Sequence, residues 1–399
     1  MRKMIVKFHR FGPAFCVAII LVTQAFVGAS ANLGRAQSSA ENPRKDTKLE
    51  RTEREKATKR AKPEKLTKEQ EEHLLGATQH EYNSILKIAR LPEDGRVKLT
   101  DQFIIAYNTS DPYVEWIAAL TDEVAEGFER FLRKMKIDYE RPEKRMYVFL
   151  FAQRSAMDAF EATLYKLARQ TEKLENRANR PAGFYVHAIN RMVIYDQTEL
   201  ESARVEAYGE DGGRKSQKTM TRAQVTREAR ELKTRDNAVY NTETIVHELT
   251  HQLSYNYGLL PMKGGAPSWY VEGLAMLFET SDGSAALGWR YKSVLPINPI
   301  RYMEFCHYAN NASNSSLVDE LIASDQAIER LRGEAYALSW ALVYYCYKKR
   351  TKEFAKFMKL CRDKPAPRDD QDARRKNFEE CFGNVNEFKV EFIKYMNSL

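Results

Sequence analysis

Two short segments of the sequence carry residue types that can hold a metal ion. His-Glu-Leu-Thr-His occupies residues 247–251, and Trp-Tyr-Val-Glu-Gly occupies residues 269–273. Apolar residues recur at helical spacing through residues 242–255, which predicts a helix there. On that helix His247 and His251 share one face, with about 5–6 Å between their Cβ atoms. Both imidazoles can therefore reach one zinc ion at about 2.0–2.1 Å.

Glu272 is the candidate for the third protein ligand. It lies in residues 268–280, which also read as a helix after the turn Gly265-Ala266-Pro267. Two helices joined by a short loop can pack antiparallel and direct this carboxylate toward the histidines. Two neutral imidazoles and one carboxylate leave zinc with a net positive charge and a position for water, whose pKa falls to about 7. We expect Glu248 to act as general base, taking a proton from that water and passing it to a leaving nitrogen.

These linked motifs resemble those of the gluzincin zinc metallopeptidases, the peptidase-MA-like clan. Within the clan, the chain is most similar to an exported, largely uncharacterised bacterial family. The resemblance covers residues 95–360 in organisation but only residues 240–280 in sharp motif. It implies zinc bound by His247, His251 and Glu272, and hydrolysis of peptide bonds.

The chain departs from the thermolysin-type pattern at one position. That pattern has an acidic residue four positions after the glutamate ligand, where this chain has Met276. The group that orients a ligand histidine is therefore unidentified from the motif, and Glu279 is a weak candidate.

Tyr336 is the candidate donor of a hydrogen bond to the developing oxyanion. It follows Glu272 by 64 residues and opens an apolar helix, where other gluzincins place a catalytic Tyr or His. The same helix holds several further tyrosines, so packing in the core is the alternative role for Tyr336. His187 and His307 are weaker candidates for the donor.

The N-terminus has the features of an export signal. A basic start precedes the apolar residues 14–28, and Ala29-Ser30-Ala31 fits a cleavage site, which predicts a signal peptide over residues 1–31. An uncleaved membrane anchor is the alternative. Residues 32–71 are rich in Lys, Arg and Glu without an aromatic side chain, which predicts a disordered linker or a pro-segment. We expect an exported protein.

The charge of the chain does not indicate a nucleic-acid partner. Of 63 basic and 55 acidic side chains, residues 1–70 hold 16 and 7, so the remainder is balanced at 47 and 48. Such a balanced charge indicates solubility rather than a basic surface that binds nucleic acid. Four cysteines lie beyond the signal: Cys306, Cys346, Cys361 and Cys381. The sequence is compatible both with disulfide bonds between these cysteines and with buried free thiols.

The remaining pattern predicts an α+β fold. Residues 72–240 would form an α/β subdomain with strands at 103–107, 146–151, 183–187 and 192–195, and helices at 73–91, 113–135 and 156–167. Residues 241–399 would hold the zinc-binding helices and a helical lobe, with helices at 302–308, 317–322, 333–349, 351–361 and 386–396. The resemblance implies a minimal thermolysin-like fold whose edge strand lines the cleft. This strand either pairs with extended substrate or is an ordinary edge strand, and the sequence favours neither alternative.

Two charged segments interrupt the pattern, at residues 169–179 and 199–236. The second precedes the predicted zinc helix, and it is either a mobile rim over the cleft or, more simply, solvated surface.

The sequence as a whole predicts a secreted zinc metallopeptidase that acts on protein or peptide substrates. The alternative is a catalytically silent, exported binding protein that keeps the metallopeptidase fold, and a membrane is a partner only if the N-terminal segment stays uncleaved. Because metal ligation needs neutral histidines, zinc affinity should fall as the pH drops through about 6.5.

Overall fold

The computed structural model describes residues 95–167, 182–198, 238–261, 265–309, 314–330 and 332–399, with residues 223 and 227. One compact unit comprises His73–Leu164 and Ala182–Leu399, and it holds the elements below apart from the last turn of α5. The predicted signal peptide, linker and helix at 73–91, and the charged segments apart from residues 223 and 227, lie outside the described residues.

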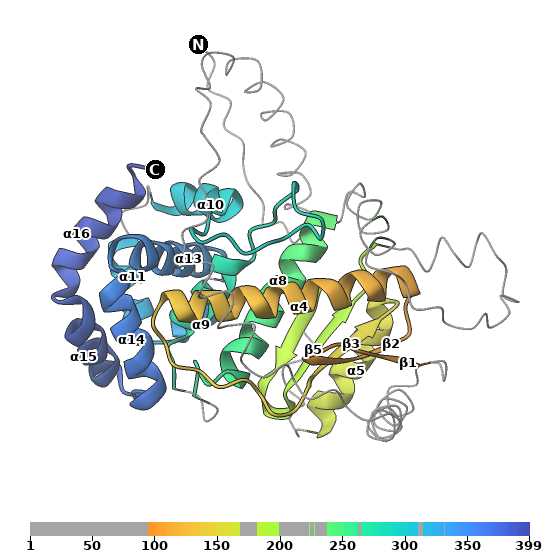
Figure 1. The fold of residues 1–399 in the computed structure, drawn as a ribbon. Helices are drawn as coiled ribbons and strands as arrows, with labels where there is room; N and C mark the ends of the chain where they lie inside the picture. Colours follow the sequence, from red (N-terminus) through yellow and green to blue (C-terminus); the bar gives the residue numbers. More distant parts are fainter. Residues whose placement is uncertain are drawn as a thin grey trace, which may run out of the picture. The chain divides into compact units, whose positions relative to one another are not determined.

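Five strands form one mixed sheet in the order β1-β2-β3-β5-β4 (Figure 1). The strands are β1 (Arg96–Leu99), β2 (Phe103–Tyr107), β3 (Met146–Phe151), β4 (Gly183–Val186) and β5 (Arg191–Tyr195). The central strands β2, β3 and β5 are parallel, and the two outer strands run antiparallel to their neighbours. The register places Val148 opposite Ile105 on one side and Met192 on the other.

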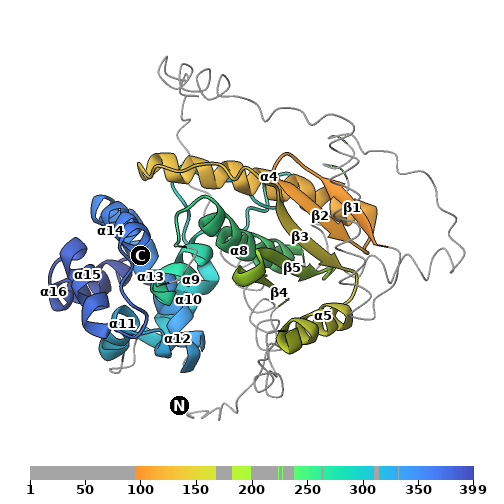
Figure 2. The same ribbon diagram turned by 90° about the horizontal axis from the view of Figure 1, so that it is seen from below.

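Both faces of the sheet are covered, which explains why its central strands are continuously apolar. Side chains alternate along β3: Val148 and Leu150 join the main core, whereas Phe149 and Phe151 join a second cluster with Phe160. Helix α5 (Arg154–Leu167) packs on this second cluster through Met157 and Phe160, and α4 (Asp111–Lys134) covers the opposite face (Figure 2).

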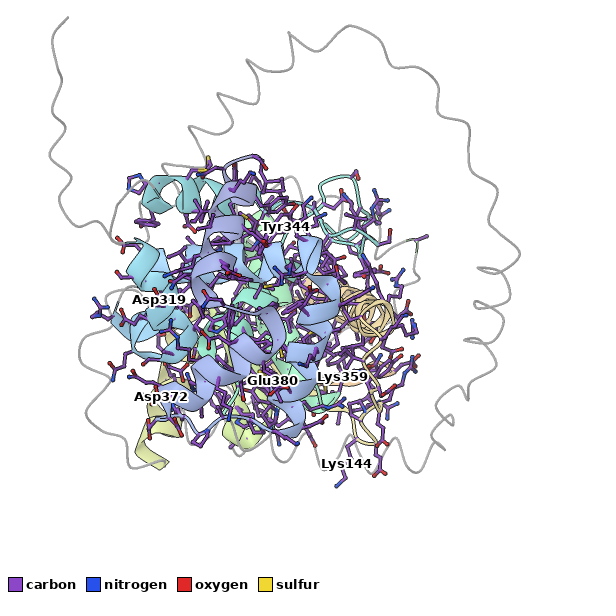
Figure 3. All side chains as sticks on the ribbon, turned by 90° about the vertical axis from the view of Figure 1, so that its left-hand side faces the viewer. Lys144, Asp319, Tyr344, Lys359, Asp372 and Glu380 are labelled. Atoms are coloured by element: carbon purple, nitrogen blue, oxygen red, sulfur yellow. The ribbon has the colours of Figure 1, made fainter. Side chains whose placement is uncertain are left out.

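The chain after the sheet is helical. Its helices are α8 (Ala238–Asn256), α9 (Ser268–Phe278), α10 (Pro299–Ala309), α11 (Asn314–Ala323), α12 (Gln326–Arg330), α13 (Arg332–Lys349), α14 (Thr351–Asp363), α15 (Gln371–Phe382) and α16 (Val385–Met396). Helix α13 is apolar on every side and lies within the bundle, packed against α9 and α10. Charged side chains such as Lys359 of α14 and Glu380 of α15 lie on the outer face of the bundle (Figure 3).

The structure confirms the coarse prediction, a mixed α+β fold with a small mixed sheet and many helices. Three elements were missed. Strand β1 has only four residues and α12 only five, so the apolar pattern of each is too short to indicate an element. Helix α15 was missed because it is highly charged and buries only a few residues, among them Phe378 and Phe382.

The four cysteines of the described residues are free, which decides between the two alternatives in favour of thiols. Cys346, Cys361 and Cys381 are buried, on α13, α14 and α15. No helix within the described ranges combines the length and the apolar character that crossing a membrane requires.

Candidate metal centre

Helix α8 carries both histidines on the face opposite its core contacts. Ile245, Leu249 and Leu253 are fully buried and fix the apolar side of the helix in the main core. The side chain of Gln252 donates a hydrogen bond of 2.9 Å to the backbone oxygen of Tyr147, which ties the helix to strand β3. The helix begins at Ala238, four residues before the predicted start.

Helix α9 is held at its start by a carboxylate and along its length by close packing. Oδ1 of Asp325 accepts a hydrogen bond of 2.8 Å from the backbone N–H of Ser268. A Cβ atom on Gly273 would lie 2.4 Å from the backbone oxygen of Ser339 and 2.5 Å from Cγ2 of Val343. Only glycine therefore lets α9 approach α13 this closely, and this contact sets the position of Glu272, the preceding residue.

The structure brings the three predicted ligands together. Nε2 of His247 lies 3.2 Å from Nε2 of His251 and 3.4 Å from Oε2 of Glu272, and the distance from His251 Nε2 to the same oxygen is 3.6 Å. Two ligands about 2.0–2.1 Å from a tetrahedral ion are separated by about 3.3–3.4 Å. The three distances, 3.2, 3.4 and 3.6 Å, are close to that value. Within the described ranges, these three residues form the one group of at least three His, Cys, Asp or Glu side chains close enough to hold a metal.

The charges at this site favour a cation. Burial alone would lower the pKa of His247, but hydrogen bonds to Glu272 and Glu279 outweigh it and raise that pKa to about 10. Burial opposes ionisation of Glu272, yet the charges of His251 and His247 hold its pKa well below the ordinary value. The carboxylates therefore bind a proton on His247 tightly, and a divalent cation can take the place of that proton.

Glu279 is the group that orients His247, as its weak candidacy suggested. Its Oε2 lies 3.1 Å from His247 Nδ1, which leaves Nε2 of that ring directed at the other ligands. Its Oε1 accepts hydrogen bonds from Asn298 Nδ2 at 3.0 Å and from Arg301 Nε at 2.8 Å. Burial opposes ionisation of this carboxyl group, but Arg301 and His247 hold its pKa below the ordinary value.

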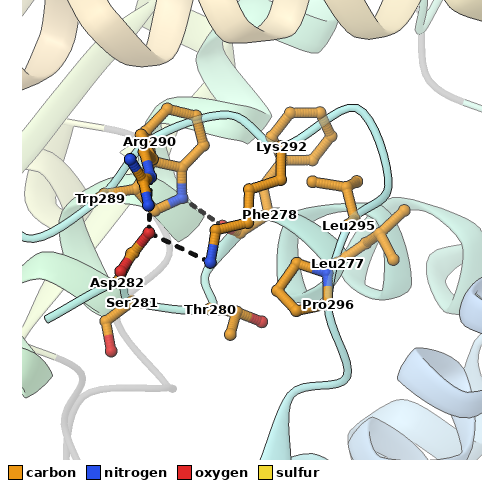
Figure 4. Close-up of a pocket in the computed structure, with 10 residues that line it drawn as sticks. All are labelled: Leu277, Phe278, Thr280, Ser281, Asp282, Trp289, Arg290, Lys292, Leu295 and Pro296. Carbon is orange, nitrogen blue, oxygen red and sulfur yellow. Dashed lines mark hydrogen bonds and ion pairs between the residues drawn. The ribbon is translucent and has the colours of Figure 1, made fainter. Parts of the chain in front are cut away.

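A folded loop between α9 and α10 returns Asn298 and Arg301 to Glu279. Asp282 anchors the loop through Arg290 Nε at 2.8 Å and Lys292 Nζ at 3.1 Å, and Trp289 Nε1 donates to the backbone oxygen of Phe278 at 2.7 Å (Figure 4). The small pocket in this loop is separate from the metal ligands. Its lining consists of Leu277, Phe278, Thr280, Ser281, Asp282, Trp289, Arg290, Lys292, Leu295 and Pro296.

Glu248 lies between the ligands and the edge strand β4. Its carboxylate accepts a hydrogen bond from the backbone N–H of Tyr185, and the charges of His247, His251 and Glu272 all act on it. Burial raises its pKa above the ordinary value in spite of the two histidines. A carboxylate with a raised pKa is suited to hold a proton temporarily.

Tyr336 lies at the same site. The charge of Glu272 is the main cause that raises the pKa of its hydroxyl group, followed by burial and by the charge of Glu248. Its hydroxyl group also hydrogen-bonds to Glu272, so it remains protonated and able to donate. The structure thus places this tyrosine beside a metal ligand rather than only in the core.

The two remaining histidine candidates lie outside the group of three ligands. His307 is exposed on α10, with its ring 5.0 Å from that of Tyr308. His187 follows β4, and its ring lies 4.1 Å from that of Tyr255, a residue on the metal-facing side of α8.

Comparison with known proteins adds a family match. Residues 241–367 match a family model described as "Protein of unknown function (DUF1570)". The matched segment contains both motifs and Tyr336, but covers less than half of the chain. A search of curated proteins finds no match.

Sequence reasoning missed several residues that support the site. Arg301 and Asn298 have no spacing signal, because a folded loop brings them back to Glu279. The N–H of Tyr185 is a backbone group, and any residue other than proline could supply it. Gly273 did carry a signal, since a glycine directly after a ligand glutamate in a helix indicates close packing.

Proposed function

We propose that this protein is a zinc-dependent metallopeptidase of the gluzincin type. The observation that carries the proposal is the arrangement of His247, His251 and Glu272 at the edge lengths of a tetrahedral ion, with Glu248 beside them. Structural zinc sites have four protein ligands, whereas catalytic sites have three and keep one position for water or substrate. A three-ligand set with an adjacent carboxylate supports catalysis rather than a structural role.

The donor set fits zinc among the common metals. Two imidazole nitrogens and one carboxylate oxygen suit a borderline-soft ion, whereas calcium and magnesium sites use oxygen ligands throughout. The bond from His247 Nδ1 to Glu279 is the orienting contact that ligand histidines usually have. A bound zinc ion would act as a Lewis acid and lower the pKa of a water molecule at the centre.

The residues of the chain would divide the remaining work. Glu248 would accept the proton of the attacking water, and the hydrogen bond from the Tyr185 N–H would keep its carboxylate in place. Tyr336 would donate its hydroxyl proton in a hydrogen bond to the negative charge that develops on the carbonyl oxygen.

Strand β4 would bind the substrate backbone. It is an edge strand of the sheet, so one side of its backbone has no neighbouring strand among the residues that the structure describes, and helix α8 lies beside it. An extended peptide could pair with this free edge and be held next to Glu248. Together with the sheet and the helical lobe, this strand supports the minimal thermolysin-like fold within the mixed α+β architecture. The sequence of the N-terminus supports export of the protein.

The second candidate function is a silent binding protein that keeps this fold. Glu248 argues against it, because a site that only binds metal has no need of a general base. Cleavage of a protein substrate distinguishes the two functions.

The test compares the full chain with a Glu248→Gln variant. Both proteins should contain about one equivalent of zinc by metal analysis, because Glu248 is not a ligand. The wild-type protein should cleave an unfolded protein substrate, and the variant should be slower by about 10²–10⁴-fold. A chelator should abolish cleavage, and added zinc should restore it. Full zinc content without cleavage of any substrate in a broad set would support the silent binding protein instead.

A further inference from the structure

Three aromatic rings form a partly exposed cluster next to the candidate metal centre. Tyr185 and His187 come from β4 and the turn after it, and Tyr255 comes from α8. The ring centroid of Tyr255 lies 5.8 Å from that of Tyr185, nearly parallel to it at 26°, and 4.1 Å from that of His187. All three residues are half-buried, so none of them is enclosed in the core, although Nε2 of His187 is itself buried.

The cluster continues the metal-binding face of α8. Tyr255 follows His251 by four residues and His247 by eight, so the three side chains succeed one another along one side of the helix. Glu272 is close enough to Tyr255 for its charge to raise the pKa of the hydroxyl group. On the strand side, the N–H of Tyr185 bonds to Glu248. A side chain adjacent to a scissile bond held at Glu248 would therefore reach these rings.

An amide pair holds the cluster rigid. Nδ2 of Asn190 donates to Oδ1 of Asn256 at 2.8 Å, and Nδ2 of Asn256 donates to Oδ1 of Asn190 at the same distance. The hydroxyl group of Tyr185 donates to the same Asn190 oxygen at 2.9 Å. Asn190 is in the left-handed region with φ of 51°, a conformation that Asn tolerates better than most residues. The turn after β4 is thus fastened to the C-terminal end of α8, and the ring positions are fixed before a ligand binds.

The rings present a neutral surface. Burial lowers the pKa of His187, so its imidazole is uncharged near neutral pH. The charge of Arg191 does act on Tyr185, but its guanidinium group is held over the ring of Tyr147, 3.8 Å from the centroid. A charged side chain would find no opposite charge on the rings themselves, whereas a planar apolar ring would find stacking and edge-to-face partners.

We propose that Tyr185, His187 and Tyr255 form a specificity subsite that accepts an aromatic side chain next to the scissile bond. This inference rests on the proposed function and names its substrate class, peptides with Phe, Tyr or Trp at one position beside the cleaved bond. Aromatic pairs at centroid distances of about 4.5–7 Å bind more tightly than burial alone would give, by about 2- to 10-fold. The subsite therefore favours an aromatic ring over a saturated ring of the same size.

The test measures binding of phosphinic dipeptide analogues to the zinc-loaded full chain by calorimetry. The phosphinate replaces the scissile bond, and the compounds carry phenylalanine, cyclohexylalanine or alanine side chains on either side of it. On one side, the phenylalanine compound should bind at least about tenfold more tightly than the alanine compound, and about 2- to 10-fold more tightly than the cyclohexyl compound. Tyr255→Ala should abolish this preference, so that the variant binds the phenylalanine and alanine compounds with equal affinity.

Two further variants guard against a change of fold. Tyr255→Phe keeps the ring and should keep the preference, and His187→Ala weakens the cluster from the strand side and should reduce it. If the analogues bind but phenylalanine and alanine are equivalent on both sides, the subsite is refuted and the metal centre stands. If no analogue binds to the zinc-loaded protein, the subsite and the proposed function both fall.

Discussion

His247 and Glu279 share a hydrogen bond of 3.1 Å between Nδ1 and Oε2, and the other oxygen of Glu279 is bonded to Arg301. An imidazole, a carboxylate and a guanidinium group thus form one chain from the candidate metal site to helix α10. The thermolysin-type position for the acidic residue holds Met276, which is fully buried in the core. The orienting carboxylate is found at the end of α9 instead.

Glu279→Gln is expected to weaken metal binding without unfolding the protein. The amide lacks the charge that favours the Nδ1 proton of His247, and loss of such a contact typically reduces metal affinity about 10- to 100-fold. Competition with a chromophoric chelator measures the zinc affinity. The matched control is Glu304→Gln, because Glu304 also bonds to Arg301, at 3.0 Å. Equal zinc affinity of the two variants would contradict the role of Glu279.

Zinc affinity should rise with pH well above the range expected from an ordinary histidine. With its pKa raised to about 10, His247 is protonated in the metal-free protein at neutral pH. Zinc must displace this proton, so the apparent affinity should increase about tenfold for each pH unit between pH 7 and 9. The sequence alone placed this dependence near pH 6.5. Titrations in two buffers of different ionisation enthalpy count the proton, and affinity that is constant over this range would refute the prediction.

Gly273→Ala should destabilise the packing of α9 against α13. The added methyl group would meet the backbone of Ser339 at 2.4 Å, and overpacking of this kind costs about 1–3 kcal/mol. Urea unfolding measures the free energy, and metal analysis shows whether Glu272 has been displaced. Gly283→Ala is the control, because a Cβ atom there meets nothing within 4 Å. A Gly273→Ala protein as stable as the control would show that the two helices can separate at little cost.

Asp325→Ala should lower the free energy of unfolding more than most other substitutions away from the candidate metal site. Arg374 has no exposed side-chain surface and makes two hydrogen bonds to Asp325, at 2.7 and 3.0 Å. Removing the carboxylate would leave the buried charge of Arg374 without this partner and lower the free energy of unfolding by about 3–5 kcal/mol. Glu320→Ala removes the exposed ion pair with Arg330 and should cost at most about 1 kcal/mol. Thermal or urea unfolding of both variants measures the difference, and similar losses would contradict the prediction.

Asp122→Asn should stabilise the protein at neutral pH but not at pH 4. Burial raises the pKa of Asp122 from 3.8 to about 6, against a hydrogen bond from Thr100 that lowers it. Between these values the folded state keeps a proton that the unfolded state has released, so the contribution to stability falls as the pH rises from about 4 to 6. The amide avoids this loss, and the gain above pH 7 should be at most about 3 kcal/mol. Urea unfolding of the wild-type and variant proteins at pH 4 and pH 7 measures the difference, and an equal effect at both pH values would contradict the prediction.

The clustering of His247, His251 and Glu272 could be predicted because local geometry largely dictates it. The spacing of His247 and His251 on a helix is a property of the chain itself, and their meeting requires only that the helix forms. Glu272 needed one further assumption, that the next helix packs against the first. The structure meets it.

The residues around the ligands could not be predicted with the same certainty, because they depend on tertiary packing. Arg301 reaches Glu279 only after the loop anchored by Asp282 has folded. Tyr336 was placed by its distance in sequence from Glu272, although the tyrosines on the same helix gave an equal case for the core. Most helix and strand positions could be predicted from apolar periodicity. Strand β1 is too short for such a pattern, and α15 is too highly charged.

Cys361 and Cys381 are free thiols, so a thiol reagent can be used to detect opening of the C-terminal bundle. Both thiols are shielded, and α14 and α15 pack against each other. A thiol reagent can label them only when this part of the bundle opens, so the labelling rate reports how often it does. Because none of the cysteines in the described residues is bridged, recombinant material from a reducing cytoplasm should reach the same fold.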